Sequence, residues 1–176
     1  GKKKIMITTG GTDCFNIAGK VGKKLAETFE LKDTEILIIS GKFNDHFLEL
    51  KKLSNEFNNI TVMSDVKNMA ELMQLCDYAI SAGGTTLYEL CYCGIPTVCF
   101  AFSDNQIESV EEFGNEGIMI NVGDVRDNID KSIDNICVSV VELYRNINLQ
   151  NIYRNKMKML VDGKGTERIA YEIIKL

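Results

Sequence analysis

The stretch Ser81–Leu90 has the sequence SAGGTTLYEL, and it decides the fold that we expect for the rest of the chain. It continues the short apolar run Tyr78–Ile80, which predicts a buried strand because it is brief and bounded by turn-forming residues. The two glycines permit a tight turn, and Thr85 and Thr86 can begin a helix. Strand, glycine turn and helix N-terminus direct unpaired backbone N–H groups toward one point, where a phosphate can bind. Taken alone, these residues fit an ordinary strand-to-helix connection equally well.

Composition indicates one globular domain. The chain has 176 residues, 45% of them hydrophobic and 26% charged, which suffices for one core but not for two ordinary domains. The formal net charge is -5 and no stripe of Lys and Arg interrupts it, so nucleic acid is not expected as a partner. No apolar run approaches the roughly 20 residues of a membrane span, and no signal-peptide pattern opens the chain. We therefore expect a cytoplasmic protein without a transmembrane segment.

The cysteines and the histidine predict neither a metal site nor a catalytic relay. The six cysteines, at positions 14, 76, 91, 93, 99 and 137, have mostly apolar neighbours, which indicates buried free thiols. Cys91 and Cys93 lack the spacing of a zinc knuckle and have no matching pair. His46 is the single histidine, so a Ser-His-Asp or Cys-His relay would have to include it. Its polar surroundings indicate a structural or exposed residue.

Predicted strands and helices alternate along the chain. This alternation indicates right-handed βαβ units, and we expect an α/β fold with one Rossmann-like domain over residues 1–176 and an open, mainly parallel sheet. Six strands are expected, at residues 4–8, 35–39, 59–63, 78–80, 97–101 and 118–121. Helices are expected at residues 16–30, 47–53, 69–75, 85–93, 107–115, 127–144, 149–159 and 166–175.

The glycine-containing and polar loops follow the predicted strands. They comprise residues 10–16, 64–68, 81–86 and 102–106. In an open parallel sheet, ligands bind in the crevice beyond the carboxyl ends of the strands. Because all four loops fall at that edge, the phosphate-binding interpretation of Ser81–Leu90 is favoured over an ordinary connection.

Neither glycine turn matches a familiar cofactor motif. Gly10–Asp13 lacks the third glycine of the dinucleotide fingerprint, and the second strand ends at Ser40 and Gly41 without the acidic residue that binds the NAD ribose. No Gly-Lys-Ser/Thr follows either turn, so neither is a P-loop. We expect no bound cofactor.

Taken in order, four segments resemble the C-terminal half of GT-B nucleotide-sugar enzymes. They are Gly10–Asn16, Val62–Met73, Ser81–Glu89 with the Gly-Ile-Pro that follows at residues 94–96, and Asp104–Gln106. The resemblance is greatest to UDP-sugar hydrolases of the pseudaminic acid pathway and their spore-coat polysaccharide relatives. It is more distant to lipid II-forming N-acetylglucosaminyltransferases. The match covers nearly the whole chain, and it is more specific for the superfamily than for the hydrolases.

The resemblance implies a nucleotide site. Its residues would be Val66, Gly83, Gly84, Thr85, Thr86 and Glu89. Of these, Val66 would offer its backbone to the uracil edge, and Glu89 would accept two hydrogen bonds from the ribose hydroxyls. The residues between them would hold the diphosphate, which agrees with the helix-dipole argument.

The resemblance also implies a cleft for the sugar and the phosphates. Its lining would come from the loops after the first and fifth strands: Gly11, Thr12, Asp13, Asn16, Asn105 and Gln106. Asn105 and Gln106 would face the sugar, and the others would lie near the phosphate.

GT-B enzymes have two Rossmann domains, and in this family the catalytic histidine belongs to the N-terminal one. This chain begins on the first strand of the second, so we expect no catalytic residue within it, an N-terminal GT-B partner domain and no activity in isolation. The resemblance implies the UDP-sugar-binding domain of a hydrolase that releases UDP and a diacetamido-trideoxy sugar for pseudaminic acid or surface polysaccharide biosynthesis. The alternatives are the donor-binding domain of a glycosyltransferase and a non-catalytic nucleotide-binding module.

Overall fold

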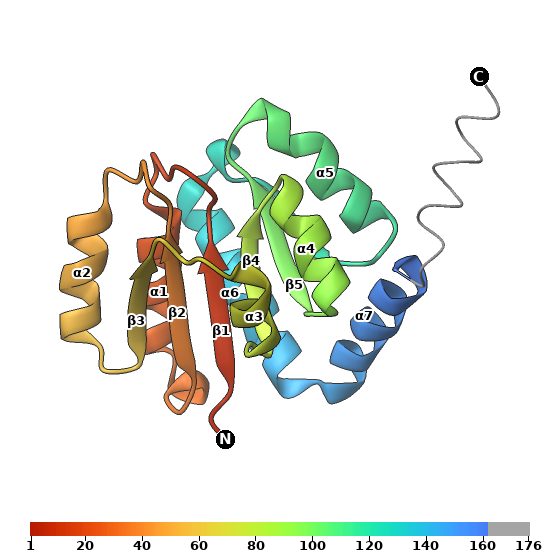
Figure 1. Cartoon of the computed structure of the whole chain (residues 1–176), viewed down its shortest axis with the longest axis horizontal. Coiled ribbons are helices and arrows are strands. Elements are labelled where there is room, and N and C mark those ends of the chain that lie inside the picture. The colour runs from red at the N-terminus through yellow and green to blue at the C-terminus, as the bar shows by residue number, and fades with distance from the viewer. Residues whose placement is uncertain (162–176) are drawn as a thin grey trace.

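The centre of the structure, a computed structural model that describes residues 1–161, is an open six-stranded sheet (Figure 1). All five strand pairs are parallel, and the strand order is β3-β2-β1-β4-β5-β6. The expected single α/β domain is confirmed, with a sheet that is parallel throughout. The strands are β1 Lys4–Thr8, β2 Glu35–Ser40, β3 Ile60–Ser64, β4 Tyr78–Ala82, β5 Thr97–Ala101 and β6 Ile120–Asp124.

Helices connect the strands at close to the expected places. The predicted helix over residues 16–30 is divided, because Thr28 is extended (φ -79°, ψ 117°) and separates the helix from a short 3₁₀ turn. The helix expected at residues 166–175 lies outside the described residues. The helices are α1 Ile17–Glu27, α2 Phe47–Glu56, α3 Met69–Gln74, α4 Thr85–Cys93, α5 Asp104–Asn115, α6 Ile129–Arg145 and α7 Ile147–Leu160, and the 3₁₀ turns are η1 Phe29–Leu31 and η2 Val125–Asp127.

Two apolar cores cover the two faces of the sheet. Alternate residues of a strand point to opposite faces, so Ile5 and Ile7 pack with α1 and α6, whereas Met6 packs with α4 and α5. All three side chains are fully buried, and each contributes about 1.5–3 kcal/mol through the hydrophobic effect. Burial on both faces explains why β1 and β2 are continuous apolar runs rather than alternating ones. Figure 1 shows α3 and α4 in front of the sheet and α1 and α6 behind it.

The last described helix, α7, is fastened to the body of the domain at two points. Gln150 is 2% exposed, and its side-chain nitrogen donates to the Tyr78 hydroxyl at 2.9 Å and to the Leu143 carbonyl at 2.7 Å. Further along α7, Met157 is fully buried in the same core as Met6. A polar anchor and an apolar anchor therefore hold α7 against the sheet.

The strand order opens a crevice at the carboxyl edge of the sheet. The chain builds outward from β1 to β3 and then returns to form β4 on the other side of β1. The connections after β1 and β4 consequently leave in opposite directions, which is the topological switch point where open α/β sheets bind ligands. In Figure 1 this edge lies at the top, where the strand arrows point.

All six cysteines are free thiols, but the expectation that they are buried holds for only four of them, because Cys14 is exposed and Cys93 is half-buried. Cys14, in the loop after β1, is exposed, whereas burial raises the pKa of Cys76 and Cys91 to about 11 and that of Cys99 and Cys137 to about 12. Residues 1–161 hold no group of three or more His, Cys, Asp or Glu side chains placed to bind a metal ion. Over the same residues, none of the helices combines the length and apolar composition that a membrane span requires.

Candidate functional site

The N-terminus of α4 lies at the switch point with two unpaired backbone donors. The N–H of Gly83 donates to the Phe100 carbonyl at 2.9 Å, and the N–H of Gly84 donates to the Ser109 hydroxyl at 3.0 Å. No side chain caps the helix, and the N–H groups of Thr85 and Thr86 have no acceptor within the described part of the chain. The donors available to an anion are therefore those of the two threonines, and the N–H groups of the two glycines are already bonded.

The glycines have a different role, which is to give the turn its shape. Gly84 adopts φ 121° and ψ -164°, a conformation that residues with a Cβ rarely adopt. At Gly83 the restriction is contact, because a Cβ would lie 2.6 Å from the Gln106 carbonyl oxygen and 2.9 Å from the Ser109 hydroxyl oxygen. The first turns of α5 therefore press directly on the turn that precedes α4.

Ser109 is a residue that the sequence did not single out. Besides accepting from Gly84, its hydroxyl donates to the Gln106 carbonyl at 2.9 Å. It thus joins the N-terminus of α5 to the glycine turn. A serine within an amphipathic helix carries no sequence signal for such a contact, since the contact forms only when the two helices meet.

The loop after β1 forms the other side of the crevice. Thr8 pairs in register with Ser81, so this loop and the glycine turn leave neighbouring strands at the same level. Gly11 and Thr12 are exposed, and their N–H groups have no acceptor within residues 1–161. They add two donors beside those of α4.

Asp13 lies beneath this loop rather than at its surface. Its side chain is 2% exposed, and its carboxylate accepts hydrogen bonds from the N–H groups of Ile17 at 2.8 Å and Ala18 at 2.9 Å. Burial raises the pKa of the Asp13 carboxyl, although these two donors oppose the shift. The structure therefore assigns Asp13 to the start of α1, whereas the sequence analysis had placed it in the cleft lining.

Asn16 joins a polar cluster between this loop and α2. It adopts the left-handed conformation (φ 51°), and its side-chain nitrogen donates to a carboxylate oxygen of Glu49 at 2.9 Å. The other Glu49 oxygen lies 3.1 Å from Nδ1 of His46, and Nε2 of His46 lies 3.4 Å from the Cys14 carbonyl oxygen. His46 thus fastens the loop after β1 to the start of α2. The hydrogen bond to Glu49 raises the pKa of His46.

On the β3 side, the backbone of Val66 is free. Neither its N–H nor its carbonyl forms a hydrogen bond within the described residues. Asp65, just before it, adopts φ 54°, and Asn68, two residues after it, caps α3 by accepting from the Glu71 N–H at 3.1 Å. A hollow of about 260 Å³ at the ends of β2 and β3 is lined in part by Ser64 and Asp65. Val66 follows Asp65 directly, so its unpaired backbone donor and acceptor lie next in the chain to a residue that lines this hollow.

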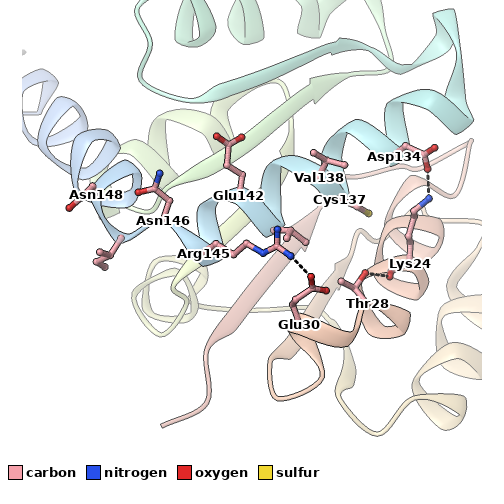
Figure 2. A pocket seen from close by; sticks show the side chains of 12 residues that line it. Lys24, Thr28, Glu30, Asp134, Cys137, Val138, Glu142, Arg145, Asn146 and Asn148 are labelled. Carbon is pink, nitrogen blue, oxygen red and sulfur yellow. Dashed lines mark hydrogen bonds and ion pairs between the residues drawn. The ribbon is translucent and has the colours of Figure 1, made fainter.

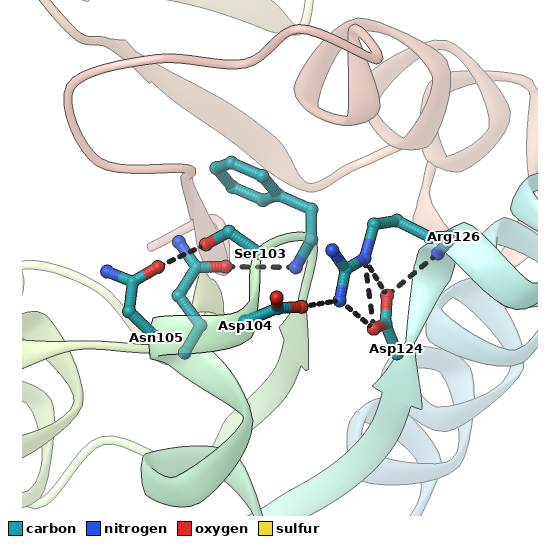
Figure 3. Close-up of polar contacts among 7 residues, drawn as sticks. Ser103, Asp104, Asn105, Asp124 and Arg126 are labelled. Atoms are coloured by element: carbon teal, nitrogen blue, oxygen red, sulfur yellow. Dashed lines mark hydrogen bonds and ion pairs between the residues drawn. The ribbon is translucent and has the colours of Figure 1, made fainter.

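Glu89 and Asn105 are exposed, and they differ in their partners. Glu89, one turn into α4, has no hydrogen bond or ion pair within residues 1–161. The amide oxygen of Asn105 accepts from the Ser103 hydroxyl at 2.6 Å (Figure 3). Gln106, by contrast, is 9% exposed, and its amide oxygen accepts from the Phe102 N–H at 2.9 Å. It closes the loop after β5 rather than extending from it.

A second hollow, of about 1030 Å³, lies between α1 and α6 (Figure 2). None of the residues predicted to bind a ligand lines it. Two ion pairs lie in its lining, Lys24 with Asp134 and Arg145 with Glu30, whereas Glu142 has no ion pair within residues 1–161. Because the residues predicted to bind a ligand lie elsewhere, we assign the candidate site to the switch point.

An open parallel sheet with free helix-terminal donors at its switch point defines a Rossmann-like α/β domain. Residues 5–159 match the sequence model of the glycosyltransferase family 28 C-terminal domain, and the chain belongs to that family. The family confirms the GT-B assignment made from the sequence. It does not single out the hydrolases within it.

Curated relatives are similar at low identity. SpsG of Bacillus subtilis, a spore coat polysaccharide biosynthesis protein, is 22% identical over 96% of this chain and 49% of its own length. The pseudaminic acid cytidylyltransferase and UDP-2,4-diacetamido-2,4,6-trideoxy-beta-L-altropyranose hydrolase of Helicobacter pylori is 30% identical over 66% of this chain and 20% of its own length. An N-acetylmuramyl-(pentapeptide) pyrophosphoryl-undecaprenol N-acetylglucosamine transferase of Thermosipho melanesiensis is 28% identical over 76% of this chain and 39% of its own length.

Solved structures agree on the fold. The glycotransferase of kitacinnamycin superposes with a TM-score of 0.70 and 18% identity, over 99% of this chain and 43% of that one. The complex of Staphylococcus aureus MnaA with UDP superposes with a TM-score of 0.68 and 14% identity, over 98% of this chain and 45% of that one. The chain spans about half the length, or less, of the proteins that it matches.

Proposed function

We propose that this chain is the UDP-sugar-binding domain of a hydrolase that releases UDP and a diacetamido-trideoxy sugar. The observation that carries the proposal is the pair of unpaired N–H groups at Thr85 and Thr86, at the positive end of α4 and at the switch point of the sheet. These donors suit a diphosphate. Gly11 and Thr12 add two more from the opposite loop.

The uracil, the ribose and the sugar of a UDP-sugar would find complementary polar groups along the same edge of the sheet. The unpaired peptide of Val66 suits the uracil edge, which has donor and acceptor groups of its own. Glu89 is exposed and unpaired, and a carboxylate accepts hydrogen bonds from two ribose hydroxyls. The sugar would then lie toward α5, near Asn105.

In the proposed reaction, water attacks the sugar donor, the bond between the sugar and the diphosphate breaks, and UDP leaves. The dipole of α4 and its free N–H groups stabilise the negative charge that develops on the diphosphate. The proposal places the general base in an N-terminal GT-B domain of the parent protein, so this domain alone is expected to bind nucleotide and to catalyse nothing. A role in pseudaminic acid or surface polysaccharide biosynthesis is supported by what the Helicobacter and Bacillus relatives are named for.

Calorimetric titration tests the nucleotide assignment. UDP should bind saturably, whereas CMP, GDP and NAD should not match it. Glu89→Ala should weaken UDP binding roughly tenfold, because a charge-assisted hydrogen bond contributes about 1.5–3 kcal/mol. Glu56→Ala is the matched control, since it removes an exposed glutamate from α2. Equal affinity for all four nucleotides, or no binding of UDP, would contradict the proposal.

A transferase donor domain is the second candidate, and the name of the family together with the Thermosipho relative favours it. The parent protein distinguishes the two when it is incubated with a UDP-linked diacetamido sugar in water enriched in ¹⁸O. A hydrolase gives free sugar together with UDP, and the label enters one of the two products. A transferase gives label-free UDP and a glycoside, and only when an acceptor is present.

A further inference from the structure

Arg126, in η2 directly after β6, connects the start of α5 to the end of β6 (Figure 3). Its Nη2 donates to a carboxylate oxygen of Asp104 at 2.6 Å and to one of Asp124 at 2.6 Å, and its Nε lies 3.0 Å from both Asp124 oxygens. Asp124 also accepts from the backbone N–H of Arg126 at 3.0 Å. The guanidinium is thus fixed on Asp124, whose side chain is 18% exposed, and it restrains Asp104, whose side chain is 90% exposed.

This pair lies next to the proposed diphosphate site. Asp104 is the first residue of α5, and α5 touches the turn at Gly83 and Gly84 through Gln106 and Ser109. Because β4, β5 and β6 are neighbours, Gly84, Asp104 and Arg126 follow one another along the carboxyl edge of the sheet. The strands that these residues follow are spaced roughly 4.8 Å apart. A group linked to the diphosphate reaches the pair without leaving the edge.

Two polar atoms of the pair have no partner within residues 1–161. They are the second carboxylate oxygen of Asp104 and the Nη1 of Arg126. A carboxylate only accepts hydrogen bonds and a guanidinium only donates them. An acceptor and a donor held side by side are complementary to an amide, whose N–H donates and whose carbonyl accepts.

We infer that Asp104 and Arg126 form a specificity-determining pair that selects sugars carrying an acetamido group, and that Asp124 is the positioning residue that fixes the guanidinium. The inference deepens the proposed function and rests on it, because it needs a nucleotide sugar at the same edge. The acetamido N–H donates to Asp104, and the acetamido carbonyl accepts from Arg126. The sequence does not indicate this pair, because Asp104 and Arg126 are 22 residues apart and that spacing follows no motif.

The test compares UDP, UDP-glucose and UDP-N-acetylglucosamine in calorimetric titrations of the same chain. The last two sugars differ in one group, a hydroxyl against an acetamido group. The unaltered chain should bind the acetamido sugar roughly tenfold more tightly, the effect of one charge-assisted hydrogen bond. Arg126→Met, Asp104→Ala and Asp124→Ala should each abolish this preference and change the affinity for UDP less than twofold. Arg145→Met, which breaks the exposed ion pair between Arg145 of α6 and Glu30 of η1, should retain it.

Four results would overturn the inference, and they differ in meaning. If the unaltered chain does not prefer the acetamido sugar, or if Arg126→Met keeps the preference, the pair does not select the sugar, although the UDP assignment stands. If Arg126→Met weakens all three ligands equally, Arg126 has a structural role only. If the unaltered chain does not bind UDP, the proposed function fails and the inference fails with it.

Discussion

His46 faces a hydrogen-bond acceptor with each of its ring nitrogens. One is a carboxylate oxygen of Glu49 and the other is the carbonyl of Cys14. Only the protonated imidazole can donate to both, because a neutral ring has one N–H. Asp13, under the same loop, adds a further negative charge nearby. The position therefore favours the cation, and the pKa of His46 is raised.

The raised pKa of His46 predicts a stability that depends on pH. The folded state holds the proton more tightly than the unfolded state, so the stabilisation is complete below about pH 6.5 and is lost as the pH rises through the folded-state pKa. The melting temperature of the unaltered chain should exceed that of His46→Gln by roughly 1–3 °C at pH 5.5 and by less at pH 8.5. When Glu49 is replaced by Gln, the difference in melting temperature that His46→Gln causes at pH 5.5 should also become smaller. A gap that is the same at both pH values would refute the role.

At this scale, the sequence could indicate residue types but not their directions. The resemblance to GT-B enzymes implies that Asp13 lines a cleft, yet its carboxylate turns inward and accepts hydrogen bonds from the N–H groups of Ile17 and Ala18. An aspartate four residues before a helical N–H fits a cap as well as a ligand contact, and only burial decides between them. Ser109 and Arg126 act through partners 25 and 22 residues away, which no local pattern reports.

At the scale of elements, the glycine turn before α4 is defined by its contact with α5. The two glycines after β1 and the two after β4 look alike in sequence, but their surroundings differ. A Cβ at Gly83 would meet α5, whereas one at Gly11 would meet no atom of residues 1–161 within 4 Å. The structure thus separates a glycine required by packing from one that packing does not require.

This difference predicts opposite outcomes for two matched substitutions. Gly83→Ala should lower the free energy of unfolding by about 1–3 kcal/mol, because α4 and α5 must separate to admit the methyl group. Gly11→Ala should change it by less than about 0.5 kcal/mol. Urea denaturation followed by circular dichroism measures both. Equal effects would show that the contact between α5 and the turn does not limit the packing.

Most elements could be predicted because their boundaries have strong local signals. Gly94 adopts φ 70° and ends α4, and Pro96 precedes β5, so the helix expected to run toward Cys93 and the strand expected at residues 97–101 agree with the structure. The strand expected at residues 118–121 begins two residues later. Ile118 and Met119 are buried, but both their N–H groups bond the Phe113 carbonyl in a turn at the end of α5. Apolar residues that enter a core from a turn cannot be told from a short strand by periodicity.

At the scale of the whole molecule, α7 is the helix that connects α6, on one face of the sheet, with the core on the other face. It begins beside α6, touches α4 and adds Met157 to the core on the α4 side. No sequence pattern indicates which of the methionines near its end is the anchor. Met157 is fully buried, whereas Met159 is 71% exposed.

Truncating these two methionines should therefore affect stability very differently. Met157→Ala removes a fully buried side chain and should cost about 2–5 kcal/mol of unfolding free energy. Met159→Ala should cost less than about 0.5 kcal/mol. Thermal melts with a common heating rate compare them. If both variants melt with the unaltered chain, α7 is not part of the cooperative unit.

The distribution of the thiols offers a way to observe the crevice directly. Four of the six cysteines are buried with raised pKa values and will react slowly with alkylating reagents, and Cys93 is half-buried. Cys14 alone is exposed, in the loop that forms one wall of the crevice. A maleimide dye should therefore label this natural chain mainly at one position, without engineering. Its fluorescence would then report, in real time, when a ligand arrives between β1 and β4.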